Sequence, residues 1–87
     1  MVRQKQGAAD EAIRWLQAAQ TAYAAAGDAA GESRALAELG WLHQSRGTYD
    51  RATQVLHASV DRATAAGDRA GRARALNYLG AVAWRQG

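Results

Sequence analysis

The sequence predicts an all-α fold of four antiparallel helices, arranged as two copies of a helix-turn-helix repeat. Three observations carry this prediction. Apolar residues recur at the three- and four-residue spacing of an amphipathic helix. Proline is absent from the 87 residues, so no helix interior is broken. The second half of the chain also resembles the first, at a period that is typical of stacked repeats.

The repeat divides the chain into two equal units. Residues 7–46 align with residues 47–86 without a gap, and 16 of the 40 pairs are identical. We call the displacement that places residue 47 over residue 7 the repeat shift. Some matches are alanines, which would coincide by chance in this composition, but the matched glycines, aspartates and leucines would not. We therefore expect a single domain over residues 1–87, with residues 1–6 as the remnant of a preceding helix.

The first helix is expected over residues 8–26. Gly7 suits the position just past the end of an earlier helix, where a left-handed backbone is needed. Ala12 and Leu16 lie four residues apart and start an apolar stripe for packing against a neighbour. Gly27 is expected to end this helix.

The second helix is expected over residues 29–46, with Asp28 as its N-cap. Leu36, Leu39 and Gly40 follow the i, i+3, i+4 pattern of an inward stripe. A glycine inside a helix costs about 1 kcal/mol relative to alanine. Gly40 therefore predicts that a neighbouring helix approaches the backbone closely at this point.

The third and fourth helices, expected over residues 48–66 and 69–86, repeat these features. Only short loops separate the four helices, and such short loops place consecutive helices antiparallel. In the second unit the expected packing residues are Ala52, Leu56, Leu76, Leu79 and Gly80.

Composition argues against several function classes. The chain contains no cysteine, which excludes a disulfide framework and a cysteine-based zinc site. His43 and His57 have no acidic or cysteine partners at metal-ligand spacing, so we predict no metal, no cofactor and no catalytic residue. The chain is not expected to be an enzyme. No apolar run is long enough to cross a membrane and no signal peptide is evident, so a cytoplasmic location without membrane contact is expected.

Two pairs of segments resemble the tetratricopeptide repeat. The stretches LAELGWLH (36–43) and LNYLGAVA (76–83) are similar to the A helix of that family. GAADEAIRWLQAA (7–19) and GTYDRATQVLHAS (47–59) are similar to its turn and B helix. The usual period is about 34 residues, and the longer period here resembles the variety found in kinesin light chains and in bacterial signalling ATPases and regulators. The resemblance implies an α-solenoid fragment in B-A-B-A order with a scaffold or protein-binding role.

The resemblance also implies that a partner binds along the concave face of the A helices. Helical geometry places that face opposite Leu36, Leu39 and Gly40. The residues expected there are Arg34, Trp41, Gln44, Arg74, Asn77, Tyr78, Trp84 and Arg85. Arginine, tryptophan and amide side chains together suit an extended peptide with acidic and apolar groups. The alternative is that Trp41 and Trp84 pack against helices of a neighbouring chain.

Both terminal helices lack one partner in this order, so each should expose an apolar face. We therefore expect self-association through the terminal helices, whether the chain binds a further protein or peptide or acts purely as a structural assembly unit. A nucleic-acid-binding domain is a third reading, suggested by four arginines in the second unit. These arginines are spread around their helices and diluted by nearby aspartates, so nucleic acid is not favoured as the partner. They are Arg62, Arg69, Arg72 and Arg74.

Overall fold

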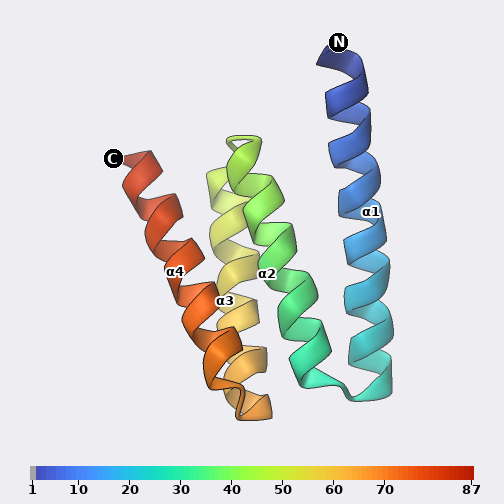
Figure 1. Ribbon diagram of the computed structural model, residues 1–87, viewed down its shortest axis with the longest axis vertical. Helices are drawn as coiled ribbons and strands as arrows, with labels where there is room; N and C mark the ends of the chain where they lie inside the picture. Colours follow the sequence, from blue (N-terminus) through green and yellow to red (C-terminus); the bar gives the residue numbers. More distant parts are fainter. Residues whose placement is uncertain (1) are drawn as a thin grey trace.

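The computed structural model describes residues 2–87, with side chains from residue 7 onward. Over residues 2–87 the chain forms four α-helices, and consecutive helices run antiparallel (Figure 1). They are α1 (Val2–Ala26), α2 (Ala29–Ser45), α3 (Tyr49–Ala66) and α4 (Arg69–Gln86). The predicted all-α fold of four helices is confirmed.

Glycines end the turns between these helices as the sequence predicts. Gly27, Gly47 and Gly67 have left-handed φ angles of 73°, 79° and 67°. Side chains larger than hydrogen are strained in this conformation, which explains why the repeat keeps glycine there. Three short reversals are thereby built into the chain.

Aspartates begin α2 and α4. The Asp28 side chain accepts a hydrogen bond from the backbone N–H of Gly31 at 2.9 Å, and Asp68 does the same for Gly71 at 2.9 Å. These bonds satisfy N–H groups that have no partner within the helix. Thr48 stands at the equivalent position before α3 but makes no side-chain cap bond.

The start of α1 differs from the prediction. The helix begins at Val2 and runs through Gly7, which does not have a positive φ angle. An isolated glycine costs only about 1 kcal/mol inside a helix. The equivalent Gly47 ends a helix because the chain reverses there to pack α3 against α2. No such reversal occurs at Gly7, so the helix continues.

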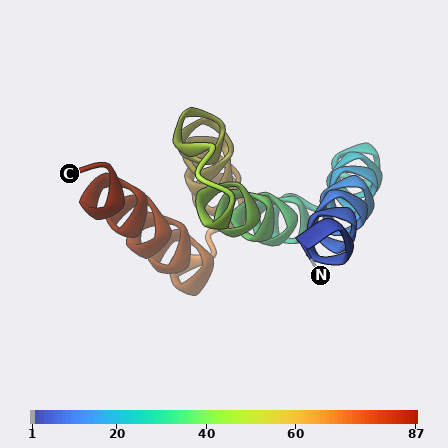
Figure 2. The ribbon, with the colours of Figure 1, turned by 90° about the horizontal axis from the view of Figure 1, so that it is seen from above.

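The helices form a zigzag rather than a bundle around one axis. α2 packs against both α1 and α3, α3 packs against both α2 and α4, and α2 also touches α4. Viewed from above, α3 is set back from α2 and α4 (Figure 2). The repeat shift relates α1 to α3 and α2 to α4, so the pairs α1–α2 and α3–α4 are equivalent contacts.

The core consists of two clusters, one whose buried residues come from α1 and α2 and one whose buried residues come from α3 and α4. In the first, Ile13, Leu36 and Leu39 are buried, with Leu42 and Val55 among the side chains packed against them. The second contains Ala52, Leu56 and Val82, which are at most 1% exposed. Here Tyr49, Tyr78 and Leu79 complete the packing. Leu36, Leu39, Ala52 and Leu56, which were expected to pack against a neighbouring helix, are buried, whereas Ala12 and Leu16 are only half-buried.

Gly40 lies where α2 and α3 come closest. A Cβ atom at this position would be 2.5 Å from Cδ2 of Leu56 and 3.0 Å from its Cδ1. Leu56 is fully buried, so its side chain has little freedom to move aside. The approach of α3 to α2 thus leaves no room for a side chain at Gly40.

Further along the same interface, two serines form a buried polar contact. The Ser33 hydroxyl donates to the carbonyl oxygen of Ser59 at 2.9 Å, and the Ser59 hydroxyl donates to the carbonyl oxygen of Ser33 at 2.7 Å. Their hydroxyl oxygens are 3.1 Å apart. Both residues are at most 2% exposed. The two serines therefore fix the register of α3 against α2, because a shift would leave buried hydroxyls without partners.

The surface of α4 that corresponds to the α3-facing surface of α2 is open. Nothing lies within 4 Å of a Cβ atom built on Gly80, and Leu76 is 44% exposed. The expected packing role of these two residues is therefore not fulfilled within this chain. The physical reason is that α2 has α3 against this surface, whereas no helix among residues 2–87 lies against it on α4.

Candidate functional site

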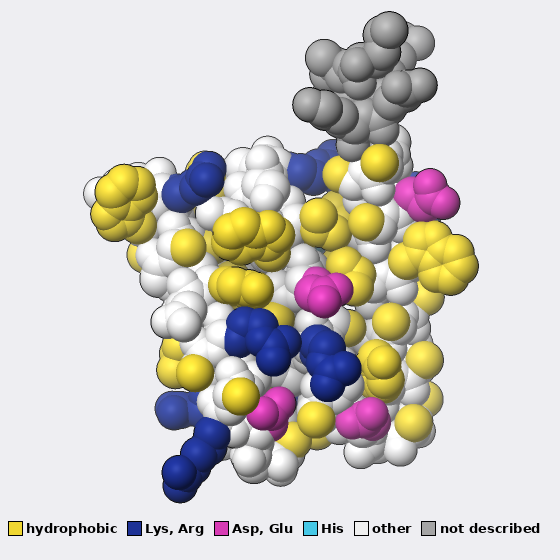
Figure 3. Space-filling model, viewed as in Figure 1, with side chains coloured by type: hydrophobic (Ala, Val, Ile, Leu, Met, Phe, Trp, Pro, Cys, Tyr) yellow, Lys and Arg dark blue, Asp and Glu magenta, His cyan; other side chains and the backbone are white. Residues whose placement is uncertain are grey.

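A groove of about 520 Å³ lies between α1 and α2 and is bordered by α4. We call it the aromatic groove. It is lined by Ala12, Trp15, Leu16, Glu38, Trp41, Leu42 and Tyr78. Figure 3 shows this face of the molecule, where hydrophobic side chains form a band over α4, α2 and α1, with an acidic side chain within it and basic side chains below.

Trp41 forms one wall of the groove and contacts Tyr78 of α4. Their ring centroids are 5.2 Å apart and the ring planes are tilted by 44°. Such tilted pairs add about 0.5–1.5 kcal/mol beyond the area that they bury. Trp41 is nevertheless 46% exposed, so the other part of its indole remains open to the groove.

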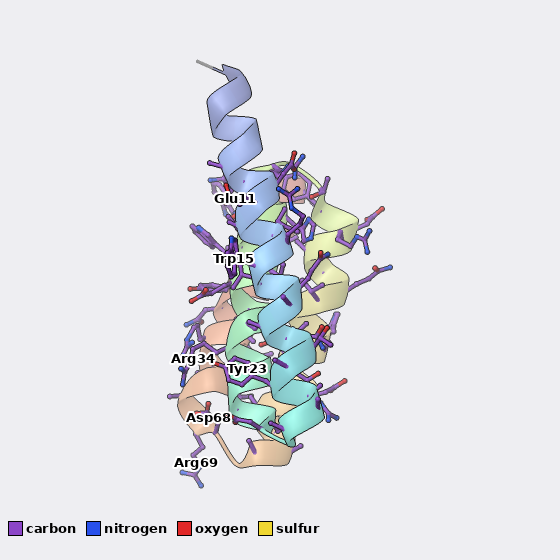
Figure 4. The ribbon with its side chains drawn as sticks, turned by 90° about the vertical axis from the view of Figure 1, so that its right-hand side faces the viewer. Glu11, Trp15, Tyr23, Arg34, Asp68 and Arg69 are labelled. Carbon is purple, nitrogen blue, oxygen red and sulfur yellow. The ribbon has the colours of Figure 1, made fainter. Side chains whose placement is uncertain are left out.

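Trp15 stands at the opposite border and is 71% exposed. It projects from α1 one helical turn after Glu11 (Figure 4). A tryptophan left this exposed is unusual, because most of its surface is apolar. The two indoles thus border an apolar floor formed by Leu16 and Leu42, and both are exposed.

Polar groups occur at the edges of the groove. Glu38 is exposed and lines it directly, and Arg34 lies one turn earlier on α2 beside Tyr23. Among the described side chains one ion pair is present, between Arg46 and Asp10 at 2.5 Å, and it joins α2 to α1 away from the groove. Glu38 is therefore available to a partner.

The residues expected on the partner-binding face do not lie together in the structure. Trp41 and Tyr78 line the aromatic groove. Trp84 is 85% exposed at the other end of the molecule, on α4. The remaining exposed residues do not line the groove. They are Arg34, Asn77 and Arg85, and Arg74 is half-buried.

Gln44 does not lie on the exposed face where it was expected. Its side chain is only 3% exposed. It is four residues after Gly40 and seven after Ala37, so it continues the stripe of α2 that faces α3. It was expected on the face opposite Gly40, but a residue four positions after Gly40 lies on the same side of the helix.

Glu38 and Leu42 line the groove although they were not expected there, and so does Trp15. Trp15 belongs to a second stripe of α1, at helical spacing from Ala8, Ala12, Ala19 and Ala22. The small size of these alanines concealed the stripe. The signal was present, because a lone indole on a continuous alanine face marks a surface that is built for contact.

The histidines offer no catalytic arrangement. His43 is half-buried, and its Nδ1 lies 3.1 Å from the Thr48 hydroxyl, which itself donates to the carbonyl oxygen of His43 at 2.9 Å. Nδ1 must therefore be the donor to Thr48. Burial, with added repulsion from Arg51 and Arg46, lowers the pKa of His43 below its ordinary value. His57 is exposed on α3.

Two features are absent from the described part of the chain. Its histidines and carboxylates form no group of three or more that could hold a metal ion. None of its helices combines the length and the apolar character needed to cross a bilayer.

Comparisons with known proteins leave this geometry as the main evidence. No protein-family model, no curated protein and no solved structure matches the chain.

Proposed function

We propose that this protein is a non-catalytic interaction module of the tetratricopeptide type, and that its aromatic groove binds an α-helix of a partner protein. The observation that carries the proposal is the groove itself, in which the exposed indoles of Trp15 and Trp41 flank an apolar floor. Exposed aromatic side chains around an apolar hollow are typical of protein-binding surfaces.

The repeat indicates the shape of the partner. The repeat shift converts four groove residues, Ala12, Trp15, Leu16 and Glu38, into residues of the second unit. Those equivalents are Ala52, Val55, Leu56 and Tyr78. Three of them pack against α2: Leu56 against Gly40, Tyr78 against Trp41, and Val55 against the cluster of Leu36 and Leu39.

The groove is therefore the place where a helix equivalent to α2 would lie, one repeat earlier. A helix in this position would contact α1 in the way that α2 contacts α3. It would also contact α2 in the way that α4 contacts α2. Helix-in-groove binding through anchors at helical spacing is a common recognition mode.

The test uses a synthetic peptide with the sequence of residues 29–45, because α2 occupies the equivalent position against α3. The peptide is titrated into ¹⁵N-labelled protein at a concentration where sedimentation shows monomer. We expect the indole N–H signals of Trp15 and Trp41 to shift and saturate, and that of Trp84, outside the groove, to stay in place. A control peptide with proline at the position of Ala37 cannot remain helical and should not bind.

Two results would count against the proposal. One is the absence of any shift at millimolar peptide, and the other is an equal shift of all three indoles, which would indicate non-specific contact. A duplex and a single-stranded oligonucleotide serve as the remaining probes at low and moderate salt. Steeply salt-dependent binding of either would favour the nucleic-acid reading instead.

A further inference from the structure

Two surfaces at opposite ends of the molecule lack a covering helix. On α4, the open surface comprises residues at helical spacing, which we call the α4 face: Ala73, Leu76, Asn77, Gly80, Ala83 and Trp84. On α1, the open surface comprises Ala8, Ala12, Trp15, Ala19 and Ala22, which we call the α1 face. The α1 face borders the aromatic groove.

Both faces have a covered counterpart inside the chain. The repeat shift relates the α4 face to the surface of α2 that α3 covers, and relates Trp15 and Ala19 of the α1 face to Val55 and Ser59, which lie against α2. The covered side is almost closed to solvent: Leu36 is 7% exposed, Gln44 3% and Ala37 1%. Their α4 equivalents are exposed, with Leu76 at 44% and Trp84 at 85%.

We infer that the helix bound in the aromatic groove is α4 of a second copy of this chain, with the α4 face of one copy packed on the α1 face of the next. This inference rests on the proposed function, because it names the partner of the same groove. The interface between copies repeats the interface between α2 and α3, so the molecule contains its own template for the contact.

The first match is the glycine notch. Within the chain, Gly40 leaves room for Leu56, which packs directly on the α2 backbone. The equivalent pair between copies is Gly80 and Leu16. Gly80 has nothing within 4 Å of its missing side chain, and Leu16 is only half-buried. A glycine that lowers helix propensity and contacts nothing in its own chain is explained if a leucine of another copy occupies the space.

The second match is a paired change of chemistry. Inside the chain, Ser33 and Ser59 face one another and exchange hydrogen bonds. Their equivalents on the open faces are Ala73 and Ala19. Had only one serine been replaced, the interface between copies would bury a hydroxyl without its partner, at a cost of stability. Both are alanine, so the contact becomes methyl against methyl.

The third match concerns volume around Trp15. Its equivalent, Val55, packs against the buried cluster of Ile13, Leu36 and Leu39. In the neighbouring copy the equivalent residues are Thr53, Leu76 and Leu79. Threonine replaces isoleucine, so the socket is larger where the valine knob becomes an indole.

The charge at the contact between copies also differs from the charge at the internal interface between α2 and α3. Arg51 of α3 lies close enough to His43 of α2 to lower its pKa, as does Arg46. The equivalents at the junction between copies are Glu11 on α1 and Ala83 and Gln86 on α4. The accumulation of positive charge at the internal interface is thus absent at the external one. Asn77, which replaces the buried Ala37, is the one added polar group on the α4 face.

Such a contact joins two different surfaces and is therefore heterologous, so it propagates unless the copies close into a ring. The decisive experiment exploits this property. Gly80→Leu blocks the α4 face and leaves the α1 face intact, whereas Trp15→Glu blocks the α1 face and leaves the α4 face intact. Both substituted positions are exposed in the single chain, so each variant should keep the circular-dichroism spectrum of the folded protein.

We expect sedimentation equilibrium to show wild-type protein associating with concentration into species above the 9.3 kDa monomer. Each variant alone should associate at least roughly tenfold more weakly. An equimolar mixture should form a dimer that grows no further, because one intact face of each kind remains. Trp84→Glu replaces Gly80→Leu if the latter does not fold, and Arg85→Ala, next to Trp84 but off the α4 face, is the control that should leave association unchanged.

The inference is overturned if wild-type protein stays monomeric at millimolar concentration. It is also overturned if either variant alone dimerises as strongly as the wild type, since that result indicates a two-fold contact through one face. If the residue 29–45 peptide binds but the protein does not self-associate, the groove serves another protein and the proposed function stands. If the peptide fails to bind, the proposed function itself fails.

Discussion

Replacing Gly40 by alanine tests whether the approach of α2 and α3 sets the stability of the fold. The added Cβ would be 2.5 Å from Cδ2 of Leu56, far inside van der Waals contact. Leu56 is 0% exposed and cannot swing into solvent, so the helices must separate or the leucine must adopt a poor rotamer. Overpacking of this kind costs about 1–3 kcal/mol.

Helix propensity acts in the opposite direction. Glycine to alanine in a helix interior gains about 1 kcal/mol. The clash should outweigh this gain at Gly40, for a net loss of about 1 kcal/mol. At Gly80 the same substitution meets open space in the single chain, so the full gain of about 1 kcal/mol should appear there. The two variants should therefore differ by about 2 kcal/mol, although the positions are equivalent in the repeat.

The measurement is urea unfolding followed by far-ultraviolet circular dichroism, at a protein concentration where sedimentation shows monomer. A change of about 1 kcal/mol in a domain of this size corresponds to roughly 4–8 °C in Tm, so thermal unfolding provides a second readout. The Leu56→Ala background is the control, because it removes the atoms that the new Cβ would strike. In that background Gly40→Ala should be neutral or stabilising. Equal stability of the Gly40→Ala and Gly80→Ala variants would refute the reasoning.

Five further substitutions probe the polar contacts by equilibrium unfolding. Ser33→Ala and Ser59→Ala should each lower the free energy of unfolding by about 1 kcal/mol, and the double variant by less than the sum, because it leaves no unpaired hydroxyl; strict additivity would contradict this. Asp28→Ala should cost about 1 kcal/mol through loss of the helix cap, whereas Thr48→Ala, at a position without a cap bond, should change stability by less than about 0.5 kcal/mol. The pKa of His43 is below its ordinary value of 6.5 in the folded protein, so the unfolded chain binds more protons as the pH falls. The free energy of unfolding should be constant above about pH 7.5 and should decrease as the pH falls through 6.5. The His43→Gln variant should lack this decrease. If its pH profile is identical to that of the wild type, His43 is not the source of the decrease.

The fold was largely predictable because its signals are local. Left-handed glycines such as Gly27 and capping aspartates such as Asp28 mark the helix boundaries within a few residues. Gly7 misled the prediction because the same residue type ends a helix only where the chain has a neighbour to turn back onto. That information is not contained in the residue itself.

The candidate site was harder to predict because it depends on which helix surfaces are covered. Gly40 and Gly80 have the same local pattern, yet one lies under Leu56 and the other is open. Gln44 was assigned to the face opposite Gly40, but a residue four positions after Gly40 lies on the same side of the helix and is buried. Trp15 was overlooked because its stripe consists of alanines, whose weak hydropathy does not distinguish an interface from a solvated surface.

The one-sided packing of α1 has a consequence for how the molecule opens. α3 is held between α2 and α4, whereas α1 contacts only α2 among the described helices. In a linear array each helix is stabilised by its nearest neighbours, so an end element can detach without disrupting the rest. Amide hydrogens in the middle of α3 should exchange only by global unfolding, while those of α1 exchange by a cheaper opening. Unfolding of this chain is therefore graded from one end, and a neighbour placed against α1 would make it more cooperative.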